Sequence, residues 1–215
     1  MVFKVDHIRA IPARCSSTTQ LDKPAKFVWL PQYDEARVLV DLFISKLSYI
    51  HHVVHHPSLS EIVDDLYRQI SGQRSVKLGH LVLFLSIVAS ATHVWTPQDD
   101  VGCESSLFSS EAEAHAQASL WVKATYDVLD GWQDGPPVAL ETVQGIIILS
   151  FLVCNLEGVS LRYRSLLSTG LLLSRELGLH RIDDASNGPV PNTIRAEMGR
   201  RVWWYLVATD WYCLL

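Results

Sequence analysis

Apolar residues recur along most of the chain at intervals of three and four positions, the spacing that places them on one face of a helix. The first such stripe begins near Asp34 and comprises Leu39, Leu42, Phe43, Leu47 and Ile50. Further helices are predicted over about 59–70, 76–94, 110–129, 140–156 and 159–177, and a last one runs from about 192. The short alternating runs of a sheet protein are missing from the sequence. The pattern therefore predicts an all-α fold, built as a multi-helix orthogonal or superhelical array.

Local signals predict where the helices begin and where the chain turns. Ser58 with Glu61, and Ser110 with Glu113, have the spacing of a capping box, in which each side chain bonds to the backbone N–H of the other residue. Residues 96–109 and 130–137 are predicted loops. Residues 1–30 have no sustained periodicity, so we expect a loose N-terminal segment followed by one folded domain over 31–215. Because the last helix is still running at residue 215, we expect the array to be incomplete at the C-terminus.

Composition supports a single globular domain. The chain has 215 residues, 48% of them hydrophobic and 19% charged, which suits one well-buried core. The apolar runs at 81–91 and 146–154 are shorter than the ~20 residues that cross a bilayer, so they predict buried helices. The N-terminus has no continuous apolar segment of the signal-peptide kind. We therefore expect a soluble chain with no membrane partner.

Charge and cysteine usage narrow the function classes. Lysine and arginine number 18 against 23 acidic residues, a formal net charge of −5, whereas a duplex-binding domain normally carries a basic stripe. The four cysteines, Cys15, Cys103, Cys154 and Cys213, lie far apart and form no CxxC motif. Neither a disulfide framework nor a zinc ribbon is indicated, and a reducing intracellular setting fits best.

The run HHVVHH at residues 51–56 is the one candidate metal site. His51 and His55 are four apart, as are His52 and His56, a spacing that can place two imidazoles on one helical face. His56 precedes Pro57, however, and a residue before proline is disfavoured in helical geometry, so we expect no stacking over His52. Two imidazoles are also fewer than the three protein ligands of a catalytic zinc. A partly exposed junction between two helices, with one imidazole packed or hydrogen-bonded, is the favoured interpretation, and no metal is predicted.

Two later stretches carry a family resemblance. Residues 141–181 read ETVQGIIILSFLVCNLEGVSLRYRSLLSTGLLLSRELGLHR, and residues 200–210 read RRVWWYLVATD. Together they resemble the fungal-specific transcription factor domain, the middle homology region of fungal zinc-cluster transcription factors. Its landmarks are a helix that closes in LGLHR and a following Arg-Arg-x-Trp-Trp helix that contains an aspartate. The stretch HHPSL matches a further family motif, with His55 and Pro57 in register, so the resemblance extends over about residues 30–215.

Elementary helix chemistry accounts for the LGLHR landmark. Gly170 lies in the middle of an apolar arc, where it allows a neighbouring helix to approach closely. Gly178 is placed to end the helix in left-handed geometry, and Leu179 can then fold back onto the apolar face. His180 and Arg181 follow beside the last carbonyls, where positive charge is favoured. We interpret this landmark as a helix stop.

The Arg-Arg-x-Trp-Trp helix is predicted to have two different faces. Trp203 flanks the apolar arc, whereas Trp204 points away beside Arg201, which forms an i, i+4 ion pair with Glu197. Asp210 also flanks the apolar arc, and a carboxylate there needs donors. We hypothesise that Asp210 bonds to the LGLHR end and locks the two landmark helices together.

The resemblance implies a regulatory domain that controls RNA polymerase II transcription in the nucleus and acts with other transcription-factor segments or co-regulators, with a small-molecule effector as a further candidate partner. It implies no enzyme, no catalytic or cofactor-binding residue and no cofactor in this chain, since zinc belongs to the family's six-cysteine module. That module is missing here, as is the Gly-Arg-Pro that usually follows the Trp-Trp helix, so we expect a fragment that reaches DNA only through a separate zinc cluster. The first alternative is a cytosolic α-helical interaction scaffold derived from such a factor. A metal-dependent enzyme built on the histidines is a weaker one.

Overall fold

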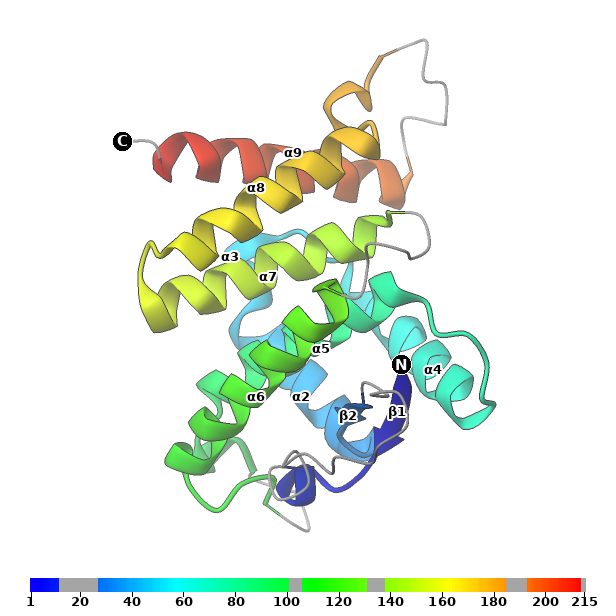
Figure 1. Cartoon of the computed structure of the whole chain (residues 1–215), viewed down its shortest axis with the longest axis vertical. Coiled ribbons are helices and arrows are strands. Elements are labelled where there is room, and N and C mark those ends of the chain that lie inside the picture. Colours follow the sequence, from blue (N-terminus) through cyan, green and yellow to red (C-terminus); the bar gives the residue numbers. More distant parts are fainter. Residues whose placement is uncertain (12–26, 101–105, 131–137, 185–192, 214–215) are drawn as a thin grey trace, which may run out of the picture.

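The computed structural model describes residues 1–11, 27–100, 106–130, 138–184 and 193–213. Helices make up most of the described chain (Figure 1). They are α2 (Tyr33–Lys46), α3 (Ser48–His51), α4 (His56–Ser71), α5 (Leu78–Val94), α6 (Glu111–Asp130), α7 (Leu140–Glu157), α8 (Leu161–Glu176) and α9 (Ile194–Cys213). Short 3-10 turns lie at Ile8–Ala10, Pro97–Asp100 and Leu179–Arg181. The predicted all-α class is confirmed.

The N-terminal segment differs from its prediction as a loose chain. Strand β1 (Val2–Val5) pairs in parallel with β2 (Phe27–Leu30). Ile8 is fully buried just after β1, and its N–H donates to the Glu35 carboxylate at 3.0 Å. The same carboxylate accepts from the backbone at the start of α2, so one buried acid fastens both segments. Four-residue strands are too short to show alternation, and these two are separated along the chain, which is why the sequence pattern missed them. Residues 12–26 lie outside the described residues.

The centre of the fold is the packing of α5 against α7. α6 and α2 also pack on α5, and α8 packs on α7, followed by α9 on α8 (Figure 1). A Cβ on Gly145 of α7 would lie 2.9 Å from the backbone of Val82 and Leu83, so the two central helices touch backbone to backbone. Helices enclosed on all sides need apolar residues all round, which explains the two continuous apolar runs.

Helix α7 is long and apolar enough to cross a bilayer by length and composition, with a mean hydropathy of 1.5. In this fold, however, 67% of it is buried inside the protein, between α5 and α8. The burial is that of a core helix in a globular domain.

Several helix boundaries match their predictions within two or three residues. The predicted cap at the start of α6 is present: the Glu113 N–H donates to Ser110 Oγ at 3.2 Å. The return bond is shifted by one residue, since the Glu113 carboxylate accepts from the N–H of Ser109 rather than Ser110. The predicted helix over 34–50 is divided at Leu47 into α2 and α3. Of the predicted loops, residues 101–105 and 131–137 are outside the described part of the chain.

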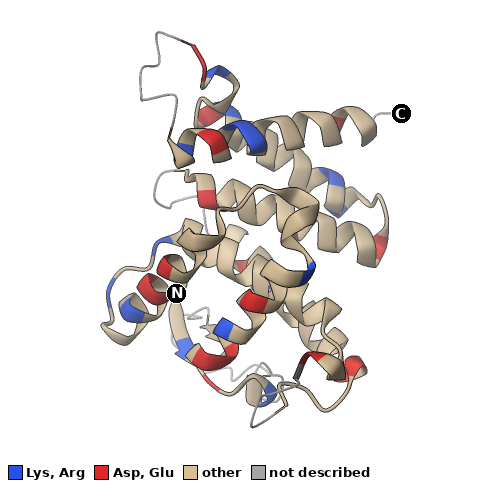
Figure 2. Cartoon of the chain, turned by 180° about the vertical axis from the view of Figure 1, so that it is seen from behind, with Lys and Arg blue, Asp and Glu red and all other residues tan. Residues whose placement is uncertain are grey.

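Charged residues are dispersed over the described surface. In Figure 2 lysine and arginine alternate with acidic residues and occur singly or in pairs on several helices. The first half of α9 holds a mixed group of both signs, whereas its second half is almost free of charge. Among the cysteines, Cys154 is a free thiol, and Cys15 and Cys103 fall in segments that are not described.

Candidate functional site

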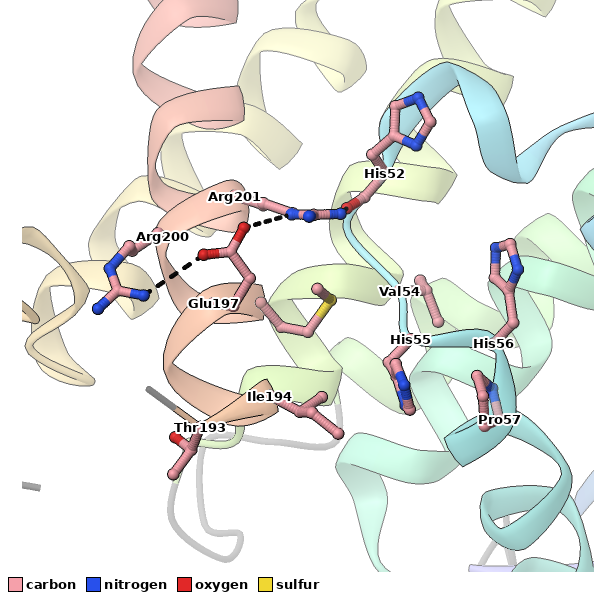
Figure 3. Close-up of a pocket in the computed structure, with 11 residues that line it drawn as sticks. His52, Val54, His55, His56, Pro57, Thr193, Ile194, Glu197, Arg200 and Arg201 are labelled. Atoms are coloured by element: carbon pink, nitrogen blue, oxygen red, sulfur yellow. Dashed lines mark hydrogen bonds and ion pairs between the residues drawn. The ribbon is translucent and has the colours of Figure 1, made fainter. Parts of the chain in front are cut away.

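The histidine run and the Arg-Arg-x-Trp-Trp helix, distant in sequence, face each other across one open pocket of about 650 Å³ (Figure 3). We call it the corner pocket. One wall is the α3–α4 corner, with His52, His55 and Pro57; the other is the first half of α9, with Arg200 and Arg201. Four residues of the family motifs, His55, Pro57, Arg200 and Arg201, therefore line the same pocket.

The α3–α4 corner is formed by a left-handed residue. His52 has φ 52° and ends α3, and three non-helical residues follow before α4 begins at His56. The predicted break before Pro57 is therefore wrong in its position, because His56 is already helical. Pro57 lies in the first turn of α4, where a missing N–H costs no hydrogen bond. His52 and His56 do not share a helical face, but the cause is the turn at His52.

The start of α4 also corrects the predicted capping box. The helix begins two residues before Ser58, so Ser58 and Glu61 are not its N-cap and N3 residues. Instead His55 is the N-cap, and its Nδ1 lies 2.8 Å from Ser58 Oγ. Ser58 therefore orients the His55 side chain at the wall of the corner pocket.

His51 and His55 do not form a metal-binding pair. His51 is 7% exposed, and its ring makes edge contacts with Phe151 and Tyr205 at centroid distances of 4.8 and 5.4 Å. Burial lowers the pKa of His51 to about 4, so the ring is neutral near pH 7. Across the described ranges, no three His, Cys, Asp or Glu side chains are grouped as a metal site would require. One imidazole is packed and another hydrogen-bonded, which is the junction favoured from the sequence.

Glu197 organises the α9 wall of the corner pocket. Its carboxylate accepts a hydrogen bond from Arg201 Nε at 2.8 Å, the predicted i, i+4 pair, and a longer one from Arg200 at 3.4 Å. The bond from Arg201 holds the pKa of Glu197 below its usual value. Arg201 also reaches the backbone oxygen of His52 at 3.4 Å, as Figure 3 shows. This bond joins the two walls of the pocket.

Apolar side chains complete the pocket lining. Val54 and Pro57 lie on the corner wall, and Ile194 and Met198 lie on α9. Both α4 and α9 begin at this pocket, so the positive ends of two helix dipoles point toward it. The pocket therefore combines an apolar floor with a positive rim, and Glu197 is the one acid among the described residues that line it.

The LGLHR landmark is a helix stop, as predicted. Gly178 has φ 71°, in the left-handed region, and it leads into the 3-10 turn Leu179–Arg181. Leu179 is buried against α9, where a Cβ on Gly199 would lie 3.3 Å from Leu179 and 2.6 Å from Ile182. Gly199 is thus the residue that lets this turn approach α9, and nothing in its local sequence pattern singled it out.

Gly170 has the role expected of it. A Cβ there would lie 3.1 Å from Leu206 of α9 and 3.3 Å from Ile146 of α7. Two helices therefore approach α8 at this one glycine, and close packing joins α7, α8 and α9 into one layered unit.

The hypothesis for Asp210 is wrong in its partner. Asp210 is half-buried and makes no hydrogen bond or ion pair with any described residue. The acid that joins the LGLHR end to α9 is Asp183, whose Oδ1 accepts from Arg200 Nε at 2.7 Å. That bond raises the pKa of Arg200. Position explains the error, since Asp210 lies almost three helical turns beyond Arg200 along α9.

The adjacent tryptophans serve different surfaces, as the helical wheel predicts. Trp203 is half-buried with its ring 5.7 Å from that of His180, which ties it to the LGLHR end. Trp204 is 65% exposed. Trp211 is 73% exposed on the same helix. The second half of α9 therefore presents aromatic side chains to solvent.

Sequence comparison assigns the family. The profile of the fungal specific transcription factor domain matches residues 39–215, most of the chain. The chain belongs to this family. The match begins within α2 and includes the α3–α4 corner, the LGLHR turn and α9, so both walls of the corner pocket belong to the family domain.

Curated relatives of the chain are transcription factors. The chain is 37% identical over 194 residues to the probable transcription factor lepB of Aspergillus flavus, covering 87% of this chain and 34% of that protein. It is 29% identical over 186 residues to the transcription factor TAS2 of Pyricularia oryzae, covering 86% and 24%. The agnestins biosynthesis cluster transcription factor AgnL11 of Paecilomyces divaricatus is 27% identical over 198 residues, covering 89% and 28%. The chain thus spans about a third or less of each relative. No solved structure matches it.

Proposed function

We propose that this domain is the regulatory domain of a fungal zinc-cluster transcription factor, and that it controls RNA polymerase II transcription in the nucleus. The observation that carries the proposal is the family domain over residues 39–215, together with relatives that are named as transcription factors and not as enzymes. Regulation in this proposal is by contact with other protein segments and involves no catalysed reaction. No cofactor is required.

The corner pocket is the proposed contact site. Its open shape, apolar floor and arginine rim suit a peptide segment that brings one acidic side chain. Arginine is enriched where binding energy concentrates in protein interfaces. Glu197 holds Arg201 in place by a hydrogen bond, so the guanidinium is oriented before the partner arrives. The partner is a co-regulator or another segment of the transcription factor.

In this proposal, sequence-specific recognition of DNA is performed by residues other than 1–215. The chain carries a net charge of −5, and its basic side chains are dispersed among acids (Figure 2). Specific binding requires contacts to base edges on top of a basic surface that neutralises phosphates.

The experiment tethers residues 1–215 to a heterologous DNA-binding domain upstream of a reporter gene in a fungal cell. We expect the tethered chain to change reporter transcription relative to the DNA-binding domain alone, and Arg201→Ala to alter that effect. Arg175→Ala, on the exposed face of α8, is the matched control and should leave the effect unchanged. Circular dichroism of the purified variants verifies that both fold.

A folded, nuclear fusion that leaves transcription unchanged would contradict the proposal. Microscopy of the untethered chain, fused to a fluorescent protein, then separates the alternatives. Retention in the cytosol would favour the interaction scaffold, which the same pocket could also serve.

A further inference from the structure

A second, smaller cavity, partly open to solvent, lies where α2, α3, α5 and α7 meet. Its volume is about 150 Å³. His51 of α3 and His93 of α5 line it together with Ser90. Phe43 and Phe151 contribute aromatic walls, and the exposed Asn155 lies at its rim. We call it the His51–His93 cavity.

Three polar side-chain atoms around this cavity have no hydrogen-bond partner among the described residues. His51 Nδ1, His93 Nδ1 and Ser90 Oγ are buried and form no hydrogen bond with any residue that the structure describes. Other buried serines in the helices behave differently, since Ser86 and Ser150 each donate to a carbonyl of their own helix. Buried polar atoms in proteins nearly always have a partner, either protein or water. Three unpaired groups around one cavity therefore indicate an occupant that supplies the missing hydrogen bonds.

Charge restricts what that occupant is. Among the described residues, no lysine, arginine, aspartate or glutamate lines the cavity. Burial lowers the pKa of His51 to about 4, and burial followed by the neighbouring His115 lowers the pKa of His93, so both rings are neutral near pH 7. A neutral imidazole offers one donor and one acceptor. An anion would find no counter-charge here, whereas an uncharged molecule with a donor and an acceptor would be fully paired.

The volume of the cavity restricts the identity of the occupant further. An apolar cavity of about 150 Å³ in another protein holds one benzene ring. The present cavity has the same volume, with aromatic walls and polar groups added. We propose that the His51–His93 cavity binds a small uncharged molecule of single-ring size, which hydrogen-bonds to His51 and His93 through a hydroxyl or N–H group. In the structure, protein atoms cover Nδ1 of His51 and Nδ1 of His93. Binding in this proposal therefore requires each ring to turn about its Cβ–Cγ bond, and the adjoining cavity provides the space for that rotation.

His51 also connects this cavity to the corner pocket. Its ring contacts Tyr205 of α9 at 5.4 Å, and the next residue, His52, accepts the hydrogen bond from Arg201. A ligand that turns the His51 ring therefore acts directly on α9 and on the corner. Any regulatory consequence of this coupling rests on the proposed function, but binding itself does not.

The test uses phenol as the probe and benzene as its apolar match, with the purified chain of residues 1–215. Calorimetry gives the two affinities, and long-range proton–nitrogen NMR reports on the histidine ring nitrogens. We expect phenol to shift the ring nitrogens of His51 and His93. We also expect it to bind roughly five- to tenfold more tightly than benzene, the ratio that one net hydrogen bond supplies.

Two variants locate the site. His51→Phe removes one of the two imidazole partners and should lower the phenol-to-benzene affinity ratio. His93→Phe removes the other imidazole partner at a half-buried position, and it keeps the test valid if the first variant does not fold; it should lower the ratio in the same way. Ser168→Ala, exposed on α8, is the control and should change nothing. Equal affinities for phenol and benzene, or phenol binding that shifts neither ring, would overturn the proposal and leave ordered water as the occupant.

Discussion

The buried His51 ring should make the stability of the fold depend on pH. The ring is 7% exposed, and burial lowers its pKa to about 4, from an ordinary value of about 6.5 in an unfolded chain. Between these two values the unfolded chain binds a proton that the folded protein does not. The free energy of unfolding is therefore fully maintained above about pH 6.5, and falls as the pH drops from there through about 4.

The magnitude follows from the two pKa values. Relative to neutral pH, His51 alone lowers the free energy of unfolding by about 1.4 kcal/mol near pH 5.5, and by about 2.5 kcal/mol near pH 4.5. His80 and His93 are also shifted downward by burial, so they act in the same direction. The share of His51 is therefore measured as a difference between two proteins and not from the total.

The assay is urea unfolding, followed by circular dichroism, of the unmodified chain and His51→Phe at neutral pH and near pH 5.5. Phenylalanine does not titrate and preserves edge packing on Phe151 and Tyr205. Between neutral pH and pH 5.5, the free energy of unfolding of the variant should fall by about 1.4 kcal/mol less than that of the unmodified protein. Tyr49→Phe, which changes an exposed ring of α3, is the control and should show the same fall in unfolding free energy as the unmodified protein. An identical loss in the unmodified protein and His51→Phe would show that the ring is not held neutral by burial, and the argument would fail.

Other predictions test the packing and the polar contacts. Asp183→Ala should lower the melting temperature slightly at low salt and not at high salt, whereas Asp210→Ala should leave the melting temperature unchanged at both. A larger decrease for Asp210→Ala than for Asp183→Ala would support the hypothesis that Asp210 bonds to the LGLHR end. Gly145→Ala should cost roughly 1–3 kcal/mol because its Cβ meets backbone, and Gly170→Ala, which meets side-chain ends, should cost less. Selection from random duplex DNA at physiological salt should enrich no motif, and a defined motif would show that these residues read bases.

The helices of this fold could be predicted because their signal is local. The period of the apolar positions located every long helix, and Gly178 marked one helix end by a conformation that glycine adopts easily. The strand pair depends instead on contacts between distant segments, fixed by the Glu35 carboxylate beneath Ile8. A glutamate on the apolar side of a helix has no distinctive pattern in sequence. Its role becomes visible only when the N-terminal segment lies over it.

The same reasoning explains why the sequence pattern predicts the wrong aspartate for the contact between the LGLHR end and α9. A helical wheel selects Asp210 because its position on the helix is apolar, whereas Asp183 stands among polar neighbours in the sequence. The contact that matters is decided by where the turn after Gly178 directs the chain, and Gly199 admits that turn against the start of α9. Asp183 then lies beside Arg200, while Asp210 remains farther along the helix. A helical wheel describes the angle of a residue around the axis, but not which part of the helix a neighbour covers.

The histidine run shows how one backbone angle can divide a motif between two sites. Spacing alone makes His51 and His55 equivalent, four residues apart on one face. The left-handed turn at His52 ends that helix, so His51 enters the core, while His55 stays at the wall of the corner pocket. The carbonyl of His52, exposed by the same turn, becomes the acceptor for Arg201. His51 lines the His51–His93 cavity, and the next residue, His52, lines the corner pocket. A change in the orientation of the His51 ring is therefore one residue away from the contact between the corner and α9.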